Sequence, residues 1–181
     1  MRSFALNAAA PLYFVSKSEV AAWPGIGWLA RATGTVFVRR ERREAWAQKH
    51  IFEDRIAAGH RLMFFPEGTS SDGLRVLKFK PTLFAGLFAE ALVDLWMQPV
   101  SVTYRAPIGS EPRFYGWWGD MDFGPHLLKV LATRRQGRVE VTWHPPMRVA
   151  DFEDRKALSA AAETAVRGGH LAAEPVAARH S

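Results

Sequence analysis

The segment of residues 64–73 constrains the fold and function of this chain more than any other. A short apolar run, residues 62–65, stops at Pro66, and a carboxylate, a glycine and three hydroxyl residues follow it. Such a run is typical of a buried strand that ends in a functional loop. Hydroxyl groups, backbone N–H groups and the nearby Lys78 and Lys80 suit the binding of an anion, above all a phosphate.

Strands alternate with helices along the chain. The apolar patterns predict strands over residues 12–15, 35–38, 62–65, 99–104 and 138–144. Helical spacing is found over residues 26–32, 41–58, 81–95, 126–133 and 151–169, the last capped by Asp151 and ended by Gly168 and Gly169. This alternation predicts an α/β fold, a single domain with a mostly parallel sheet flanked by helices. We expect the domain to span residues 1–169 and a flexible tail to span residues 170–181.

Charged residues come just after three of the predicted strands. These residues are Lys17, Arg40 and Glu67. In parallel sheets, ligands bind at the carboxyl ends of the strands. We therefore expect these three side chains to share one rim of the sheet.

Composition narrows the kinds of partner. The net charge is +6 and the pI is near 10.1, which favours an anionic partner: a nucleic acid, a phosphorylated substrate or an anionic membrane. The chain has no cysteine, so a disulfide framework and a thiolate metal site are excluded. No apolar run is long enough for a transmembrane helix, because Glu90 and Asp94 interrupt the best candidate, residues 83–100.

Four stretches resemble, in order, the motifs of one enzyme family. Residues 65–70, Phe-Pro-Glu-Gly-Thr-Ser, resemble the phosphate-binding motif of the glycerolipid acyltransferases, whose usual form is Phe-Pro-Glu-Gly-Thr-Arg-Ser. Residues 34–40 are similar to the second motif, a strand that ends in an arginine that helps to bind the acyl acceptor. Residues 99–100 are similar to the fourth motif, and residues 14–20 to the segment between the first and second. The resemblance to the 1-acylglycerol-3-phosphate (lysophosphatidate) acyltransferase family covers roughly residues 4–147.

The resemblance implies an acyltransferase of phospholipid biosynthesis. Such an enzyme moves a fatty acyl group from acyl-CoA or acyl-carrier protein to the hydroxyl of a lysolipid such as 1-acylglycerol-3-phosphate. It implies no metal, no cofactor and no covalent enzyme intermediate. The expected partners are the lysolipid, the acyl donor and an anionic membrane surface, with a peripheral position on its cytoplasmic face and no role for nucleic acid. The residues expected to bind the acceptor head group are Arg40, Glu67, Gly68 and Thr69, supported by Lys17 and Lys80.

Ser70 departs from the family pattern, which often has arginine at this position. The change removes one cation from the expected acceptor site. The form Gly-Thr-Ser-Ser-Asp-Gly resembles a bacterial branch that includes lyso-ornithine lipid acyltransferases. Lyso-ornithine lipid is therefore the alternative acceptor.

This chain also departs from the family pattern at the catalytic motif, His-x-x-x-x-Asp, which its sequence does not contain. In the family, this histidine is the general base and the aspartate orients it. None of the six histidines here has an aspartate five residues later, so no catalytic residue is found. Two interpretations stay open: a chain truncated before or within this motif, or a catalytically dead relative that still binds lipid. In both, we expect the 181-residue chain to have little or no activity.

The predicted site residues also allow simpler, structural interpretations. Glu67 also suits a turn carboxylate, and Lys17 and Lys80 also suit surface lysines. Arg40 also suits the solvated start of a helix, within the charged run of residues 39–43. Trp117 and Trp118, in a long loop over residues 106–124, fit either a membrane-interface anchor or a loop that packs on the core.

Overall fold

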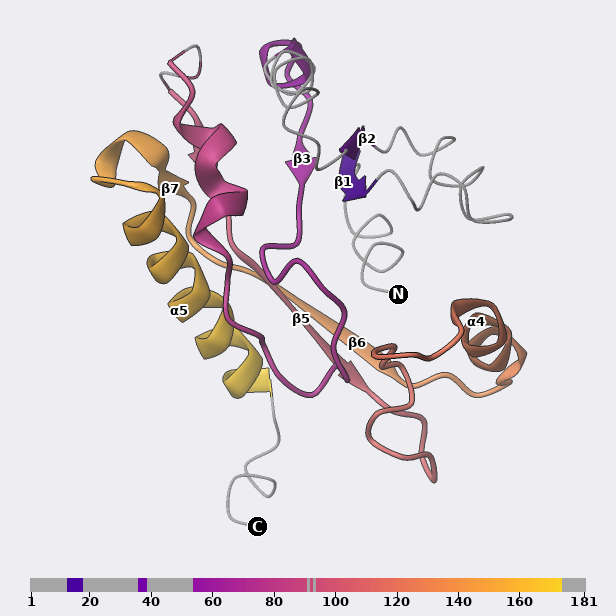
Figure 1. The fold of residues 1–181 in the computed structure, drawn as a ribbon. Helices are drawn as coiled ribbons and strands as arrows, with labels where there is room; N and C mark the ends of the chain where they lie inside the picture. The colour runs from indigo at the N-terminus through magenta and orange to yellow at the C-terminus, as the bar shows by residue number, and fades with distance from the viewer. Residues whose placement is uncertain (1–12, 18–35, 39–53, 91, 93, 174–181) are drawn as a thin grey trace. The chain divides into compact units, whose positions relative to one another are not determined.

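The computed structural model describes residues 13–17, 36–38, 54–90, 92 and 94–173 (Figure 1). The chain divides into two compact units, residues 1–65 and residues 66–181. The predicted domain boundaries stay a prediction.

The first unit contains a parallel sheet. Its strands are β1 (Tyr13–Lys17), β2 (Val36–Val38) and β3 (Leu62–Met63), in the order β2-β1-β3. Lys17 pairs with Val38 and Phe14 pairs with Met63, and both pairings are parallel. The carboxyl ends of the strands therefore point to one edge, as the sequence predicts. Of the predicted helix over residues 41–58, residues 54–58 are described: residues 54–57 are helical, and a turn follows that includes Gly59 with φ +78°.

The second unit contains helices and antiparallel strand pairs. Its elements are η2 (Pro81–Phe88), β4 (Trp96–Met97), β5 (Val100–Arg105), α4 (Phe123–Ala132), β6 (Arg138–Trp143), β7 (Met147–Arg148), η3 (Val149–Asp151) and α5 (Arg155–Ala173). β5 pairs with β6 over its whole length, and β4 pairs with β7. The strands described in this unit are antiparallel, so the parallel arrangement is found in the first unit.

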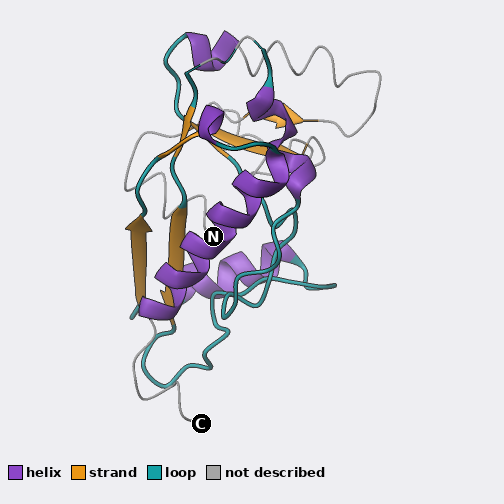
Figure 2. Ribbon diagram, turned by 90° about the vertical axis from the view of Figure 1, so that its left-hand side faces the viewer, coloured by secondary structure: helices purple, strands orange, loops and turns teal. Residues whose placement is uncertain are grey.

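The core of the second unit forms where α5 packs against η2 and β5 (Figure 1, Figure 2). Phe84 of η2 and Leu158 of α5 are fully buried, and Ala162 follows Leu158 by one helical turn on the same face. The ring of Phe79 lies 6.4 Å from that of Phe84. Burying these side chains fixes the position of residues 79–84, which follow the predicted anion-binding segment of residues 64–73.

The long helix predicted over residues 81–95 is wrong. A 3-10 helix ends at Phe88, and Ala89 has an extended backbone. Phe84 and Leu87 are buried at a spacing of three residues, which matches the 3-10 period. Leu83 and Phe88, which a 3.6-residue period would bury, are 40% and 37% exposed.

Both predicted ends of the final helix are also wrong. Asp154, not Asp151, caps α5: its Oδ1 accepts hydrogen bonds of 2.8 Å from the N–H groups of Lys156 and Ala157. At the other end, α5 runs through Gly168 and Gly169 to Ala173. Residues 170–173, which the sequence assigns to the tail, are therefore helical.

Among the described helices, none combines the length and the apolar character that crossing a bilayer requires.

Glu163 joins α5 to the loop before η2. Its Oε2 accepts a hydrogen bond of 2.9 Å from the N–H of Phe79, and its Oε1 accepts one of 2.8 Å from Arg167 Nε. Burial alone raises the pKa of Glu163, but the hydrogen bonds from Phe79 and Arg167 outweigh burial and lower it below 4.5. A lowered pKa means that the carboxylate stabilises the fold above about pH 4.5 and loses this effect as the pH falls through the folded pKa.

We expect Glu163→Gln to lower the free energy of unfolding by about 1 kcal/mol at neutral pH. The difference from the parent protein should shrink as the pH falls below about 4.5, because the parent then loses the same charge. Urea unfolding followed by circular dichroism across this range measures both values. The exposed Glu153→Gln is the control, and a Glu163→Gln effect that does not change with pH would contradict the assignment.

Candidate functional site

The candidate site is the loop of residues 66–80, which follows β3 and leads into η2. The N–H of Lys80 donates to the carbonyl of Pro66 at 2.9 Å and joins the two ends of the loop. Inside the loop, the N–H of Leu77 donates to Glu67 Oε2 at 2.9 Å. The Glu67 side chain is buried, with 5% of the residue exposed. The structure thus gives Glu67 the turn-closing contact of the simpler interpretation, and its role in acceptor binding stays a prediction.

Gly68 and Lys80 meet at the start of the loop. Gly68 has φ +68°, a backbone conformation that glycine adopts most easily. A Cβ at this position would lie 3.0 Å from Lys80 Nζ and 3.1 Å from its Cδ. The ammonium group of Lys80 therefore lies against the backbone of Gly68, while Thr69 and Ser70 are exposed beside it. An anion that reaches the loop from solvent would find a cation and hydroxyl donors together.

Asp72 organises the second half of the loop. It is 7% exposed, and its Oδ1 accepts a hydrogen bond of 3.2 Å from the N–H of Leu74. Its Oδ2 lies 3.6 Å from Arg75 Nη2 and 3.8 Å from Arg113 Nε. Both arginine side chains are more than half exposed. The sequence interpretation assigned Asp72 no role, because Arg113 comes from the distant loop of residues 106–122.

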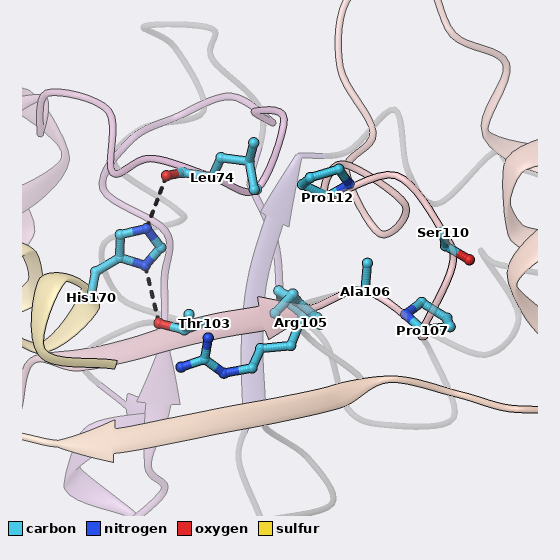
Figure 3. Close-up of a pocket in the computed structure, with 10 residues that line it drawn as sticks. Leu74, Thr103, Arg105, Ala106, Pro107, Ser110, Pro112 and His170 are labelled. Atoms are coloured by element: carbon cyan, nitrogen blue, oxygen red, sulfur yellow. Dashed lines mark hydrogen bonds between the residues drawn. The ribbon is translucent and has the colours of Figure 1, made fainter. Parts of the chain in front are cut away.

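A pocket of about 330 Å³ lies beside this loop (Figure 3). Leu74 lines one side, Thr103 and Arg105 of β5 line another, and His170 of α5 closes the end. His170 Nε2 lies 3.1 Å from the carbonyl of Leu74, and its Nδ1 lies 3.1 Å from Thr103 Oγ1. Because a carbonyl oxygen only accepts, Nε2 carries a proton, and in a neutral ring Nδ1 accepts from the threonine hydroxyl. No sequence signal indicated His170, because the predicted helix ended at Gly169.

Two other histidines, His144 and His126, pack against other parts of the second unit. His144 Nε2 lies 2.7 Å from Ser101 Oγ, which donates to the carbonyl of Val166 at 2.8 Å, so the histidine is the donor. Burial lowers the pKa of His144. The pKa of His126 is lowered first by burial and then by Lys129. His126 is 6% exposed, so its ring lies inside the fold.

The structure brings together four of the six predicted acceptor residues. Glu67, Gly68, Thr69 and Lys80 share the loop of residues 66–80. Lys17 is the last residue of β1, at the carboxyl edge of the sheet in the first unit. Arg40 lies outside the described residues. That all six meet at one site stays a prediction.

Comparison with known proteins gives concordant results. A family model described as "Acyltransferase" matches residues 1–103. The chain is 62% identical over 167 residues to a lyso-ornithine lipid O-acyltransferase of Rhodobacter capsulatus, covering 92% of this chain and 60% of that protein. It is 37% identical to a lyso-ornithine lipid O-acyltransferase of Brucella abortus, covering 90% of this chain and 64% of that protein. The chain thus spans between 60% and 64% of the length of these relatives.

A solved structure supports the fold. The 1-acyl-sn-glycerophosphate acyltransferase of Thermotoga maritima superimposes with a TM-score of 0.57 and 23% sequence identity. The match covers 92% of this chain and 59% of that one. The family match extends over more than half of the chain and includes the loop of residues 66–80. This chain therefore belongs to the acyltransferase family, as its motifs indicate.

Proposed function

We propose that this chain forms the acceptor-binding part of an acyltransferase that acts on lyso-ornithine lipid. The observation that carries the proposal is its 62% identity to a lyso-ornithine lipid O-acyltransferase over 92% of the chain. The acyl group would come from a thioester, acyl-CoA or acyl-carrier protein. Because the acceptor is a lipid and the net charge is +6, we also propose a peripheral position on the cytoplasmic face of an anionic membrane.

The charge of the loop supports this acceptor. An ornithine head group has one free carboxylate and one free ammonium, and so carries less negative charge than a phosphate monoester. With Ser70 in place of the arginine that is usual in the family, Lys80 is the cation that lies against Gly68. One ammonium group and exposed hydroxyls suit a carboxylate. Lysophosphatidate is the second candidate, favoured by the phosphate-binding form of residues 65–69.

A chimera tests the proposal even though this chain has no His-x-x-x-x-Asp. In the Rhodobacter capsulatus relative, the aligned 167 residues are replaced by those of this chain. We expect the purified chimera to acylate lyso-ornithine lipid faster than lysophosphatidate. A folded chimera that acylates neither lipid would refute the acyltransferase assignment, and one that prefers lysophosphatidate would refute the choice of acceptor.

Ser70→Arg in the chimera should shift the acceptor preference. The added guanidinium favours the doubly charged phosphate, so we expect the ratio of kcat/KM for lysophosphatidate over lyso-ornithine lipid to rise about tenfold or more. Thr142→Arg, which adds the same charge at an exposed position on β6, is the matched control. Equal ratios in the two variants would mean that position 70 does not contact the acceptor.

A further inference from the structure

The outer face of α4 is apolar. The inner side of the helix buries His126 and Val130. On the opposite side, Leu128 and Leu131 are each 68% exposed. The other exposed residues of α4 are the uncharged Gly124, Pro125 and Ala132, and Lys129, whose ammonium lies over the ring of Phe114. A helix that faces water normally carries charged or polar residues on its outer side, so this face has the character of a contact surface.

The segment before α4 is attached to the helix by aromatic contacts. Trp117 Nε1 donates to the carbonyl of Met121 at 2.7 Å. The Trp117 ring packs edge-on against Phe123 in the first turn of α4, with 5.0 Å between the ring centres. Met121 is itself 39% exposed. Tryptophan side chains are enriched where proteins meet the interface of a bilayer.

The segment that contains α4 is strongly basic. Residues 123–139 include Lys129, Arg134, Arg135 and Arg138 and no acidic residue. Arg138 pairs with Glu140 at 3.2 Å, and the ammonium of Lys129 lies 5.3 Å from the centre of the Phe114 ring. Arg134 and Arg135 are exposed and make no ion pair with another described residue. Their charge is thus available to an anionic partner just beyond the apolar face.

We propose that α4 and the two arginines after it form a docking surface for an anionic lipid bilayer. The α4 surface is defined by Leu128, Leu131, Arg134 and Arg135. Its leucines enter the boundary of the apolar layer, and its arginines contact anionic head groups, as in helices that lie in a membrane interface. Two exposed leucines beside Arg134 and Arg135 complement such a bilayer in both apolarity and charge. This inference rests on the peripheral membrane position proposed above, but not on the chemistry of the acceptor site.

Vesicle flotation of the full 181-residue chain tests the α4 surface. The vesicles contain phosphatidylcholine alone or with about 30% phosphatidylglycerol. We expect Leu128→Ser/Leu131→Ser to weaken binding to the anionic vesicles about tenfold or more. Arg134→Gln/Arg135→Gln should weaken it roughly 30-fold.

Matched controls separate the α4 surface from general effects. Arg155→Gln/Lys156→Gln removes the same charge from exposed positions on α5. Leu83→Ser/Leu171→Ser removes two other leucines, which are 40% and 55% exposed. Both controls should bind anionic vesicles like the parent chain. Thermal melting by circular dichroism verifies that every variant is folded.

A fluorescent probe locates the contact. Because the chain has no cysteine, Ala132→Cys gives a single site for an environment-sensitive dye on the α4 surface. Ala160→Cys places the same dye on the exposed side of α5. We expect the emission to shift to shorter wavelengths only for the dye at position 132, and only when the vesicles are anionic.

Two results would overturn the proposal. The first is equal vesicle binding, or equal emission shifts, for the α4 variants and their controls. The second is a leucine variant that changes the oligomeric state in gel filtration while vesicle binding is retained. In that case, α4 would be an interface between copies of the chain.

Discussion

Gly169→Ala is expected to lower the free energy of unfolding by about 3 kcal/mol, while Gly168→Ala raises it by up to about 1 kcal/mol. The two glycines are neighbours in α5, but their surroundings differ. A Cβ at Gly169 would lie 2.5 Å from His144 Cε1 and 2.6 Å from Ser101 Oγ. A Cβ at Gly168 would meet no atom within 4 Å.

The cost at Gly169 arises from a buried hydrogen-bond chain. His144 Nε2 donates to Ser101 Oγ at 2.7 Å, and that hydroxyl donates to the carbonyl of Val166 at 2.8 Å. Ser101 is 2% exposed, so a hydroxyl that loses its partner there is not compensated by water. A methyl group at position 169 must displace the imidazole or move α5 away from β5. At Gly168, alanine only reduces the conformational freedom of the unfolded chain and so favours the helix.

Urea unfolding of the two single variants at neutral pH measures this difference. Because both substitutions add one methyl group to the same helix, their helix propensities are matched. Similar unfolding midpoints for the two variants would mean that α5 does not approach β5 as closely as the structure indicates.

The strands and the site loop could be predicted from the sequence because their signals are local. Apolar runs indicated the paired strands of the first unit and the strands β5 and β6 of the second. The turn at Gly68 depends on a glycine with positive φ. The four residues of the loop that are predicted to bind the acceptor lie within one segment of 14 residues, from Glu67 to Lys80, so a local pattern was sufficient to single them out.

The ends of the helices could not be predicted, because tertiary contacts override the local signals. Two glycines normally end a helix. Here α5 continues through both glycines. Gly169 packs against His144, and the side chain of the next residue, His170, makes hydrogen bonds with Thr103 and Leu74. The contact with Leu74 joins residues 96 positions apart. No pattern within a short window reports such a contact, and the pocket that His170 closes was missed for the same reason.

Gly116→Ala is the second substitution with a large expected effect, because Gly116 joins two loops. A Cβ there would lie 2.7 Å from the carbonyl carbon of Asp72, closer still to its oxygen, and 2.8 Å from Trp118 Cζ3. The atoms of Asp72 belong to the backbone and cannot rotate away. Alanine must therefore separate residues 106–122 from the site loop, at an expected cost of about 3 kcal/mol.

The same loops are joined by the Asp72–Arg113 ion pair, so a second variant identifies which contact holds them. Arg113→Gln should cost less than about 1 kcal/mol, because the arginine is 55% exposed and 3.8 Å from the carboxylate. Hydrogen exchange at the amides of Leu74 and Leu77 measures local opening of the site loop. Gly116→Ala should accelerate it strongly, and Gly124→Ala, where a Cβ meets nothing within 4 Å, should not. If Arg113→Gln accelerates exchange as much as Gly116→Ala, the ion pair and not the close backbone approach positions the site loop.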